Sequence, residues 1–373
     1  MILNKYCNDP QQGDGNNSGS PSDLNNLDSD KPRQRRRYRN FWIYIICLVV
    51  VFGLAAAAII PLVVSRAPHT AIIRVPEGAT SQTVADSVAR YLGRDFADHL
   101  QRALPIATGG ESLQRGAWRI DQGMTAIAAA RRIGRGAQSG IRVTFVNERT
   151  VEEIAAKLAA KLDVDKDSMI AAFSDPNILS ELRTDREHII GLFLADTYEF
   201  YWTATPAEII KKLQTHYDRF WTNERMDEAA KLHLHPREIV TIASIVDEET
   251  NQSSEKGMIG RLYINRLQKG MRLQADPTVK YAMGDFSIRR ITGDMLNNPS
   301  PYNTYRYDGL PPGPIRITSG ATIDAILTSR PHSYLYMCAS EDFSGRHNFA
   351  LDYDTHLRNA RLYQQALDQR GIR

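Results

Sequence analysis

Residues 41–64 (FWIYIICLVVVFGLAAAAIIPLVV) contain no charged side chain, and this run constrains the chain more than any other feature. As an α-helix, about 24 residues extend roughly 36 Å, which is enough to cross the hydrocarbon core of a bilayer. A buried core helix normally shows a polar face, and a cleaved signal peptide has a shorter apolar run nearer the start of the chain. The sequence therefore predicts an uncleaved transmembrane helix.

The segment before this helix, residues 1–40, is rich in Asn, Asp, Gly and Ser and then in Arg. It has few apolar residues with which to offset chain entropy, so we expect a disordered tail. Five arginines lie between positions 33 and 39, whereas only Arg66 and His69 closely follow the helix. The positive-inside rule then predicts a cytoplasmic N-terminus and places residues 66–373 outside the cell (inner) membrane.

Composition excludes several classes of function for the outer part. The net charge of +3 owes much to the arginine cluster, so no nucleic-acid partner is expected. Cys338 is the one cysteine after the helix, so no intramolecular disulfide can form there. Zinc-ligand spacing, a Gly-rich phosphate loop and a G-x-S-x-G elbow are all absent from the sequence, and we expect no metal and no cofactor.

Residues 70–162 repeat a short theme of an extended apolar run, a turn and a helix. In the first copy, Ile73 and Val75 alternate as in a strand, and apolar residues at helical spacing follow the turn at residues 76–78. Small β-α units fit this pattern best. Such units could bind glycan, although a packing or spacer role explains the same apolar residues.

Residues 163–373 are predicted to form a mixed α+β domain, so the fold class is α+β. Helical stretches are followed by a long Gly/Pro/Asn-rich segment over residues 284–320, then by a strand-like run over residues 333–340 and a final helix. A loop-rich span of this length inside a compact domain is uncommon and often functional. We therefore expect it to line a groove.

The helix expected over residues 236–251 (PREIVTIASIVDEETN) carries the best candidates for acid/base chemistry. At about 100° per residue, Glu248 points away from the apolar face and is expected to be solvated, whereas Asp247 and Glu249 flank that face. A carboxyl at such a border is partly desolvated, which raises its pKa towards the range of a general acid. Helical phase does not choose between Asp247 and Glu249.

Several motifs in the same order resemble the endolytic murein transglycosylase (YceG-like) family. The matching segments are VDEET at 246–250 with Glu255, INRLQKGMRLQADPTVKYAMG at 264–284, PYNTY at 301–305, GLPPGPI at 309–315, Gly191 with DTYEF at 196–200, and His347, Phe349 and His356. The resemblance extends from residue 72 to the C-terminus. It implies that the β-α region over 70–162 is LysM-like and that residues 163–373 form a transglycosylase catalytic domain.

The resemblance also implies that Glu249 is the catalytic acid/base, because the second glutamate of the family motif I-V-E-K-E-T falls there. Asp247 replaces the first glutamate and Glu248 replaces the lysine. Ala195 stands where the family usually has Pro, and Ala275 where it has Ser or Thr. These departures affect fine loop geometry rather than the reaction, and the extra charge of Glu248 would raise the pKa of Glu249 further.

The implied reaction cleaves bonds between N-acetylmuramic acid (MurNAc) and N-acetylglucosamine (GlcNAc) within peptidoglycan strands, without water as nucleophile. Glu249 would protonate the glycosidic oxygen and then accept the proton of the muramyl C6 hydroxyl, leaving a 1,6-anhydro-MurNAc end. Such an enzyme would trim or terminate nascent strands, near the cell-wall synthesis enzymes.

Candidate substrate-binding residues are polar groups in or beside the loop-rich segment, namely Gln274, Asp276, Asn303 and Tyr305. Residues of these types also commonly cap turns and satisfy backbone groups. Glu255 is a candidate for an electrostatic or ligand role, or for a structural salt bridge. We expect His347 and His356 to be structural.

Two other hypotheses stay open on the sequence. The first is a two-carboxylate muramidase in which Asp247 or Glu255 activates water and leaves reducing ends. The second is a non-catalytic, membrane-anchored glycan-binding scaffold.

Overall fold

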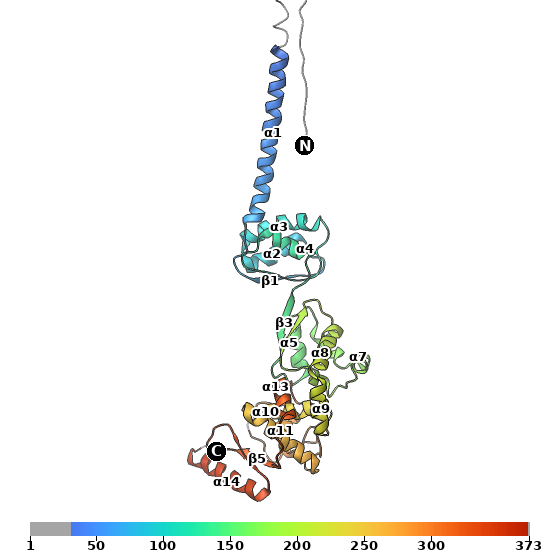
Figure 1. Cartoon of the computed structure of the whole chain (residues 1–373), viewed down its shortest axis with the longest axis vertical. Helices are drawn as coiled ribbons and strands as arrows, with labels where there is room; N and C mark the ends of the chain where they lie inside the picture. The colour runs from blue at the N-terminus through green and yellow to red at the C-terminus, as the bar shows by residue number, and fades with distance from the viewer. Residues whose placement is uncertain (1–30, 289, 372–373) are drawn as a thin grey trace, which may run out of the picture. The chain divides into compact units, whose positions relative to one another are not determined.

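A computed structural model describes residues 31–288 and 290–371 of the chain (Figure 1). The chain divides into two units, Met1–Ser65 and Arg66–Arg373. The mixture of helices and short strands confirms the α+β class.

Within the described residues, the first unit contains one helix, α1, over Lys31–Val64. Its residues Arg36–Val64 are long and apolar enough to cross a membrane. The helix begins at Lys31 rather than at residue 41, because Lys, Arg and Gln are good helix formers and prolong it beyond its apolar part. The predicted disordered tail is therefore helical over residues 31–40. The remainder of that predicted tail, residues 1–30, lies outside the described residues.

The second unit begins with two antiparallel strands, and two helices lie between these strands in the sequence. The elements are β1 (Ala71–Val75), α2 (Ser81–Leu92), α3 (Arg94–Thr108), β2 (Gly116–Ile120) and α4 (Ala126–Arg135). β1 and β2 pair with Ile73 opposite Trp118, and both side chains are buried. The expected strand-turn-helix units are present, but their strands pair with each other across an additional helix, α3.

The next elements form a second layer around another antiparallel pair. They are β3 (Gly140–Thr144), α5 (Val151–Ala159), α6 (Lys166–Ala172), α7 (Pro176–Glu181), η1 (Ile189–Leu192), β4 (Thr197–Tyr201) and α8 (Pro206–Phe220). β3 pairs with β4, with Ile141 opposite Phe200 in a shared core. The expected boundary between residues 162 and 163 therefore falls inside a packed layer. Strand pairing joins segments far apart in sequence, which local patterns do not reveal.

The remaining elements are α9 (Asn223–Lys231), α10 (Pro236–Glu249), α11 (Ser253–Gln268), α12 (Asp276–Met283), η2 (Met295–Asn297), α13 (Gly320–Leu327), β5 (Tyr336–Ala339), β6 (His347–Ala350) and α14 (Tyr353–Gln369). They include a central helix, α10, against which α9, α11, α12 and α13 pack. The expected strand-like run and final helix are present as β5 and α14. Helix α11 packs closely on α13 because Gly257 and Gly260 have no Cβ; an added one would lie 2.5 Å from Ala325 O and Ile326 Cγ1 respectively.

Helix α10 is buried on every side rather than on one face. Ile239, Ile242 and Val246 lie in the core as expected, but Val240 and Ile245 are equally buried. Helices α9, α11, α12 and α13 all pack against α10, so its outer face has no access to solvent along most of its length. This packing sets the environment of the three carboxylates with which the helix ends.

Candidate active site

Glu249 is the last residue of α10, and its side chain lines a hollow of about 410 Å³. The chain leaves the helix at Thr250 in an extended conformation and re-enters a helix at Ser253. The other walls come from α11, the segment over residues 273–276, Tyr305, the strands β5 and β6, and α14. The hollow therefore joins segments that are more than one hundred residues apart in sequence.

The surroundings of Glu249 favour its protonated form. Burial raises the pKa of this carboxyl to about 7, and the negative charge of Asp276 raises it as well. The hydroxyl of Tyr263, which donates to Oε1 over 2.6 Å, and the charges of His347 and Lys280 lower this pKa without cancelling the effect of burial. At neutral pH the carboxyl can both give and take a proton, as a general acid/base requires.

The surroundings of Asp247 favour its ionised form, although Asp247 and Glu249 both flank the apolar face of the helix. The ammonium of Lys256 donates to Oδ1 over 2.6 Å, and the hydroxyls of Thr318 and Thr322 each donate over 2.6 Å. Burial alone would raise the pKa of Asp247, but these hydrogen bonds outweigh burial and hold the pKa below its usual value. Asp247 does not line the hollow. It is an ionised structural carboxylate, so it is not the base of a two-carboxylate site.

Glu248 is not solvated, contrary to expectation. Its side chain is 18% exposed, and Oε1 accepts hydrogen bonds from Arg149 and Arg316, each over 2.7 Å. Helical phase correctly turns it away from the core of α10, but the layer that contains β3 covers that side. The two arginines neutralise its charge, and the carboxylate that raises the pKa of Glu249 is Asp276 rather than Glu248.

Three of the four predicted substrate-binding residues line the hollow. The hydroxyl of Tyr305 donates to Oδ1 of Asp276 over 2.6 Å, and Arg266 donates to Oε1 of Gln274 over 2.5 Å. Gln274 has a φ of 49°, in the left-handed region that non-glycine residues seldom adopt. Such backbone strain at the edge of a hollow is typical of functional sites.

Asn303, the fourth candidate, does not line the hollow. Its side chain is fully buried, and its amide donates to the carbonyls of Leu296 and Asn298 over 2.9 Å each. Its Oδ1 accepts the backbone N–H of Tyr305 over 3.1 Å. Asn303 shapes the loop that presents Tyr305, which is the common structural use of Asn in turns. Among the described residues of the 284–320 segment, Tyr305 is the one that lines the hollow.

Glu255 supports the hollow from behind rather than lining it. It accepts the backbone N–H and the Nδ1 of His347, both over 3.0 Å. With Nδ1 bound in this way, the ring of His347 is fixed where it lines the hollow. Glu255 is therefore a structural partner of His347, and it does not reach the hollow as a ligand or as a base for water.

The sequence reasoning missed Tyr263, Arg266 and the contribution of the two histidines. Tyr263 and Arg266 are three residues apart on α11, so a shared helix face could have grouped them. His347 and His356 reach the hollow only because β6 and α14 fold back over it, for which the sequence holds no local signal. Among the described residues, no three His, Cys, Asp or Glu side chains gather as a metal site.

Comparison with known proteins gives consistent matches over most of the chain. A family model described as the YceG-like family matches residues 73–362. The endolytic murein transglycosylase of Bacillus subtilis is 26% identical over 291 residues, which cover 73% of this chain and 79% of that protein. The endolytic murein transglycosylase of Streptococcus pneumoniae (strain D39) is 25% identical over 248 residues, which cover 64% of this chain and 43% of that protein.

A solved structure supports the fold. The crystal structure of a yceG-like protein from Listeria monocytogenes aligns with a TM-score of 0.54 and 23% sequence identity. The alignment covers 78% of this chain and 98% of that chain. At this level of identity the likeness concerns the fold alone.

Proposed function

We propose that this chain, which belongs to the YceG-like family, is an endolytic murein transglycosylase with Glu249 as its single acid/base. The curated relatives named endolytic murein transglycosylase support the general activity, that of a lyase acting on peptidoglycan. The observation that carries the assignment is the position of Glu249 at the end of α10, where it lines a hollow and burial raises its pKa to about 7.

One carboxyl suffices for the proposed reaction. Protonated Glu249 gives its proton to the glycosidic oxygen as the bond from that oxygen to C1 of MurNAc breaks. The Glu249 carboxylate then accepts the proton of the C6 hydroxyl as O6 bonds to C1, which leaves a 1,6-anhydro-MurNAc end and regenerates the acid. No water is consumed, because the nucleophile belongs to the substrate.

The other residues of the hollow are suited to holding sugars. Arg266 and Gln274 provide a charge-assisted donor pair for a carbonyl or hydroxyl oxygen. The rings of Tyr336 and His356 stack with centroids 5.4 Å apart, and Tyr353 is 57% exposed beside them. Aromatic faces of this kind present apolar area with a polar edge, which matches the faces of a sugar ring.

The hydrolytic alternative requires a second carboxylate in the hollow. Asp247 and Glu255 do not line it, whereas Asp276 does. If water were the nucleophile, Asp276 would be the group positioned to activate it. The chemistry of the new end therefore distinguishes the two reactions, since an activated water leaves a reducing sugar.

The proposal extends to the place of action. The apolar helix α1 would hold the chain in the inner membrane with its N-terminus in the cytoplasm, so that the active site faces newly made strands outside. Cleavage there would trim or terminate nascent strands, beside the wall-synthesis enzymes.

The test is digestion of purified sacculi by the full-length chain in detergent, with mass spectrometry of the released fragments. We expect anhydro-muramyl ends from the parent and from Glu224→Gln, a matched change at an exposed site on α9. Glu249→Gln should lower cleavage at least about 10³-fold, because both proton transfers are lost. Reducing ends would point to hydrolysis instead, and bound but intact sacculi would point to a scaffold.

The same variant carries its own control for folding. Between pH 4.5 and 7 folded Glu249 retains a proton that the unfolded chain has lost, so its contribution to stability falls as pH rises through this range. Glu249→Gln removes this effect, and we expect its free energy of unfolding to exceed that of the parent by about 3 kcal/mol at pH 8 and to match it at pH 4.5. Chemical denaturation at the two pH values measures the difference. A less stable variant at pH 8 would contradict the assigned pKa.

A further inference from the structure

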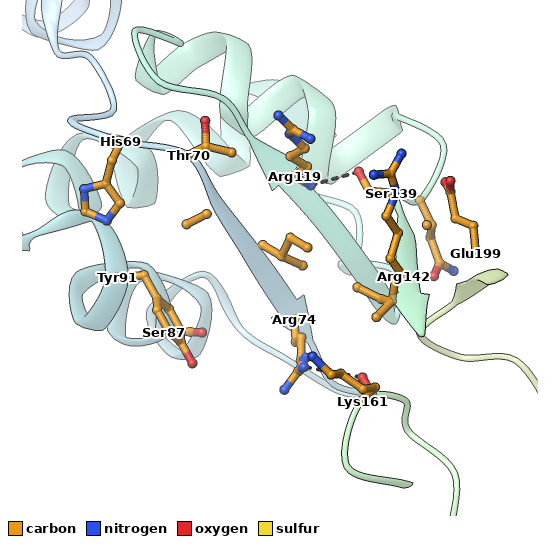
Figure 2. Close-up of a pocket in the computed structure, with 15 residues that line it drawn as sticks. His69, Thr70, Arg74, Ser87, Tyr91, Arg119, Ser139, Arg142, Lys161 and Glu199 are labelled. Carbon is orange, nitrogen blue, oxygen red and sulfur yellow. Dashed lines mark hydrogen bonds between the residues drawn. The ribbon is translucent and has the colours of Figure 1, made fainter. Parts of the chain in front are cut away.

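A second and larger hollow, of about 920 Å³, lies in the part of the chain that precedes the candidate active site (Figure 2). Its lining comes from β1, α2, β2, β3, β4 and Lys161. It shares no lining residue with the hollow at Glu249. The function proposed above makes no use of it.

Strand alternation explains why charged side chains gather there. In β1, Ile73 and Val75 are buried, so Ile72 and Arg74 face outwards. The exposed residues of the other strands include Arg119 in β2, Arg142 in β3 and Glu199 in β4. Ile72 lies opposite Arg119, and Arg142 lies opposite Glu199. The outer faces of both ladders thus line one hollow.

The charges in this hollow are not balanced. Four cations, Arg74, Arg119, Arg142 and Lys161, line it together with a single carboxylate, Glu199. Arg119 pairs with Asp121 over 2.7 Å, but the side chains of Arg142 and Lys161 have no ion pair within the described part of the chain. Like charges without partners repel one another, so this arrangement favours an anionic ligand.

The single carboxylate narrows the chemistry of that ligand. Glu199 folds over Gly140, where an added Cβ would collide with its side chain, so the glycine makes room for the acid. A carboxylate at this position repels a phosphate group but pairs with an ammonium. The exposed Tyr91 ring and Ile72 add apolar contact area, and β1 has a strand partner on only one edge within the described residues. A free strand edge can pair with an extended peptide.

We propose that this hollow binds the stem peptides of peptidoglycan, which carry several carboxylates and a free amine on a short extended chain. Arg142 and Lys161 would hold the carboxylates, and Glu199 would hold the amine. The identity of the polymer rests on the function proposed above; the charge pattern rests on the structure alone. Two sites on one polymer would raise the local concentration of glycan at Glu249.

The experiment measures binding to the full chain in phosphatidylcholine nanodiscs by calorimetry. The probes are a stem tetrapeptide that contains D-glutamate and diaminopimelate, the same peptide with its amines acetylated, and glycerol phosphate as the soluble counterpart of a lipid headgroup. The paired change Arg142→Glu with Lys161→Glu should weaken tetrapeptide binding on the order of tenfold or more. Arg102→Glu, an exposed cation on α3, is the matched control and should leave it unchanged.

Glu199→Gln tests the contribution of the ligand's ammonium separately from that of its carboxylates. It should weaken binding of the unmodified tetrapeptide and not of the acetylated one, since only the former carries an ammonium. Unchanged tetrapeptide binding in the charge-reversed variant would overturn the proposal, and so would tighter binding of glycerol phosphate than of the peptide. Cleavage of peptide-free glycan strands tests Glu249 separately, so failure at one site is distinguishable from failure at the other.

Discussion

The three carboxylates that end α10 show how far neighbours in sequence can differ in chemistry. Asp247 is ionised by an ammonium and two hydroxyls, Glu248 is neutralised by two arginines, and Glu249 retains its proton to about neutral pH. One residue of helix rotates a side chain by about 100°, and each of these three directions meets a different part of the fold. The proposed acid/base, Glu249, is the one whose charge nothing nearby fully compensates.

Removing the charges around Glu249 one at a time should shift its pKa in opposite directions. Asp276→Asn removes a charge that raises the pKa of Glu249, so this pKa should fall. His347→Gln removes a charge that lowers it, so the pKa should rise. Since the proton donor must be protonated, the loss of kcat/KM at alkaline pH should shift to lower pH in Asp276→Asn and to higher pH in His347→Gln, by up to about one unit.

Profiles of kcat/KM against pH on isolated glycan strands, at constant ionic strength, measure both shifts. Lys280→Met should shift the profile in the same direction as His347→Gln, because Lys280 also lowers this pKa. Movement of Asp276→Asn and His347→Gln in the same direction would show that another group sets the alkaline limb.

At the scale of elements, α10 connects two packed parts of the fold. Its apolar residues belong to the core formed with α9, α11 and α13, while Glu248 connects it to Arg149, which precedes α5 in the neighbouring layer. Arg149 also lies over the ring of Phe286, 4.7 Å from its centroid. Interactions of this kind fix the orientation of the end of the helix, and with it the side chain of Glu249.

Reversing the charge at Glu248 should loosen this connection. Glu248→Lys places a third cation beside Arg149 and Arg316 in a site that is mostly buried, and we expect a loss of about 2–4 kcal/mol in the free energy of unfolding. Urea denaturation measures the loss. Glu224→Lys, at an exposed position of α9, should change stability by less than about 0.5 kcal/mol. Combining Glu248→Lys with Arg149→Glu should restore part of the lost stability, and no recovery would argue against a direct ion pair.

At the scale of the whole molecule, one chain carries an apolar helix, a cationic hollow and the hollow at Glu249. The helix α1 ends at Val64, and the first lining residue of the cationic hollow is His69. Only a few residues of chain therefore separate the apolar helix from the first residue of the site proposed to hold stem peptides.

The orientation of the chain gives a prediction at this scale. Protease added to intact spheroplasts should digest residues 66–373 and leave an N-terminal tag intact, since the arginines at the N-terminal end of α1 favour the cytoplasm. Immunoblotting for the tag and for a cytoplasmic marker measures protection. Replacing the five arginines between positions 33 and 39 with glutamate should lower the protected fraction, and full protection of residues 66–373 in the parent would contradict the proposed topology.

The sequence determined those features that depend on local pattern. The apolar run, the strand-turn-helix units, the helix expected over 236–251 and observed over 236–249, and the order of the family motifs are all readable along the chain. These features rest on periodicity and composition, which neighbouring residues specify among themselves. The resemblance to the family also indicates Glu249, whereas helical phase alone does not distinguish Glu249 from Asp247 as the acid/base.

Tertiary structure decided what each side chain meets. It joined β3 to β4 across the expected domain boundary, buried Asn303, placed Glu255 behind His347, and gave Asp247 and Glu249 pKa shifts of opposite sign. The physical reason is that burial and charge act through space over a few ångströms, whereas the partners responsible lie from nine to nearly one hundred residues away along the chain.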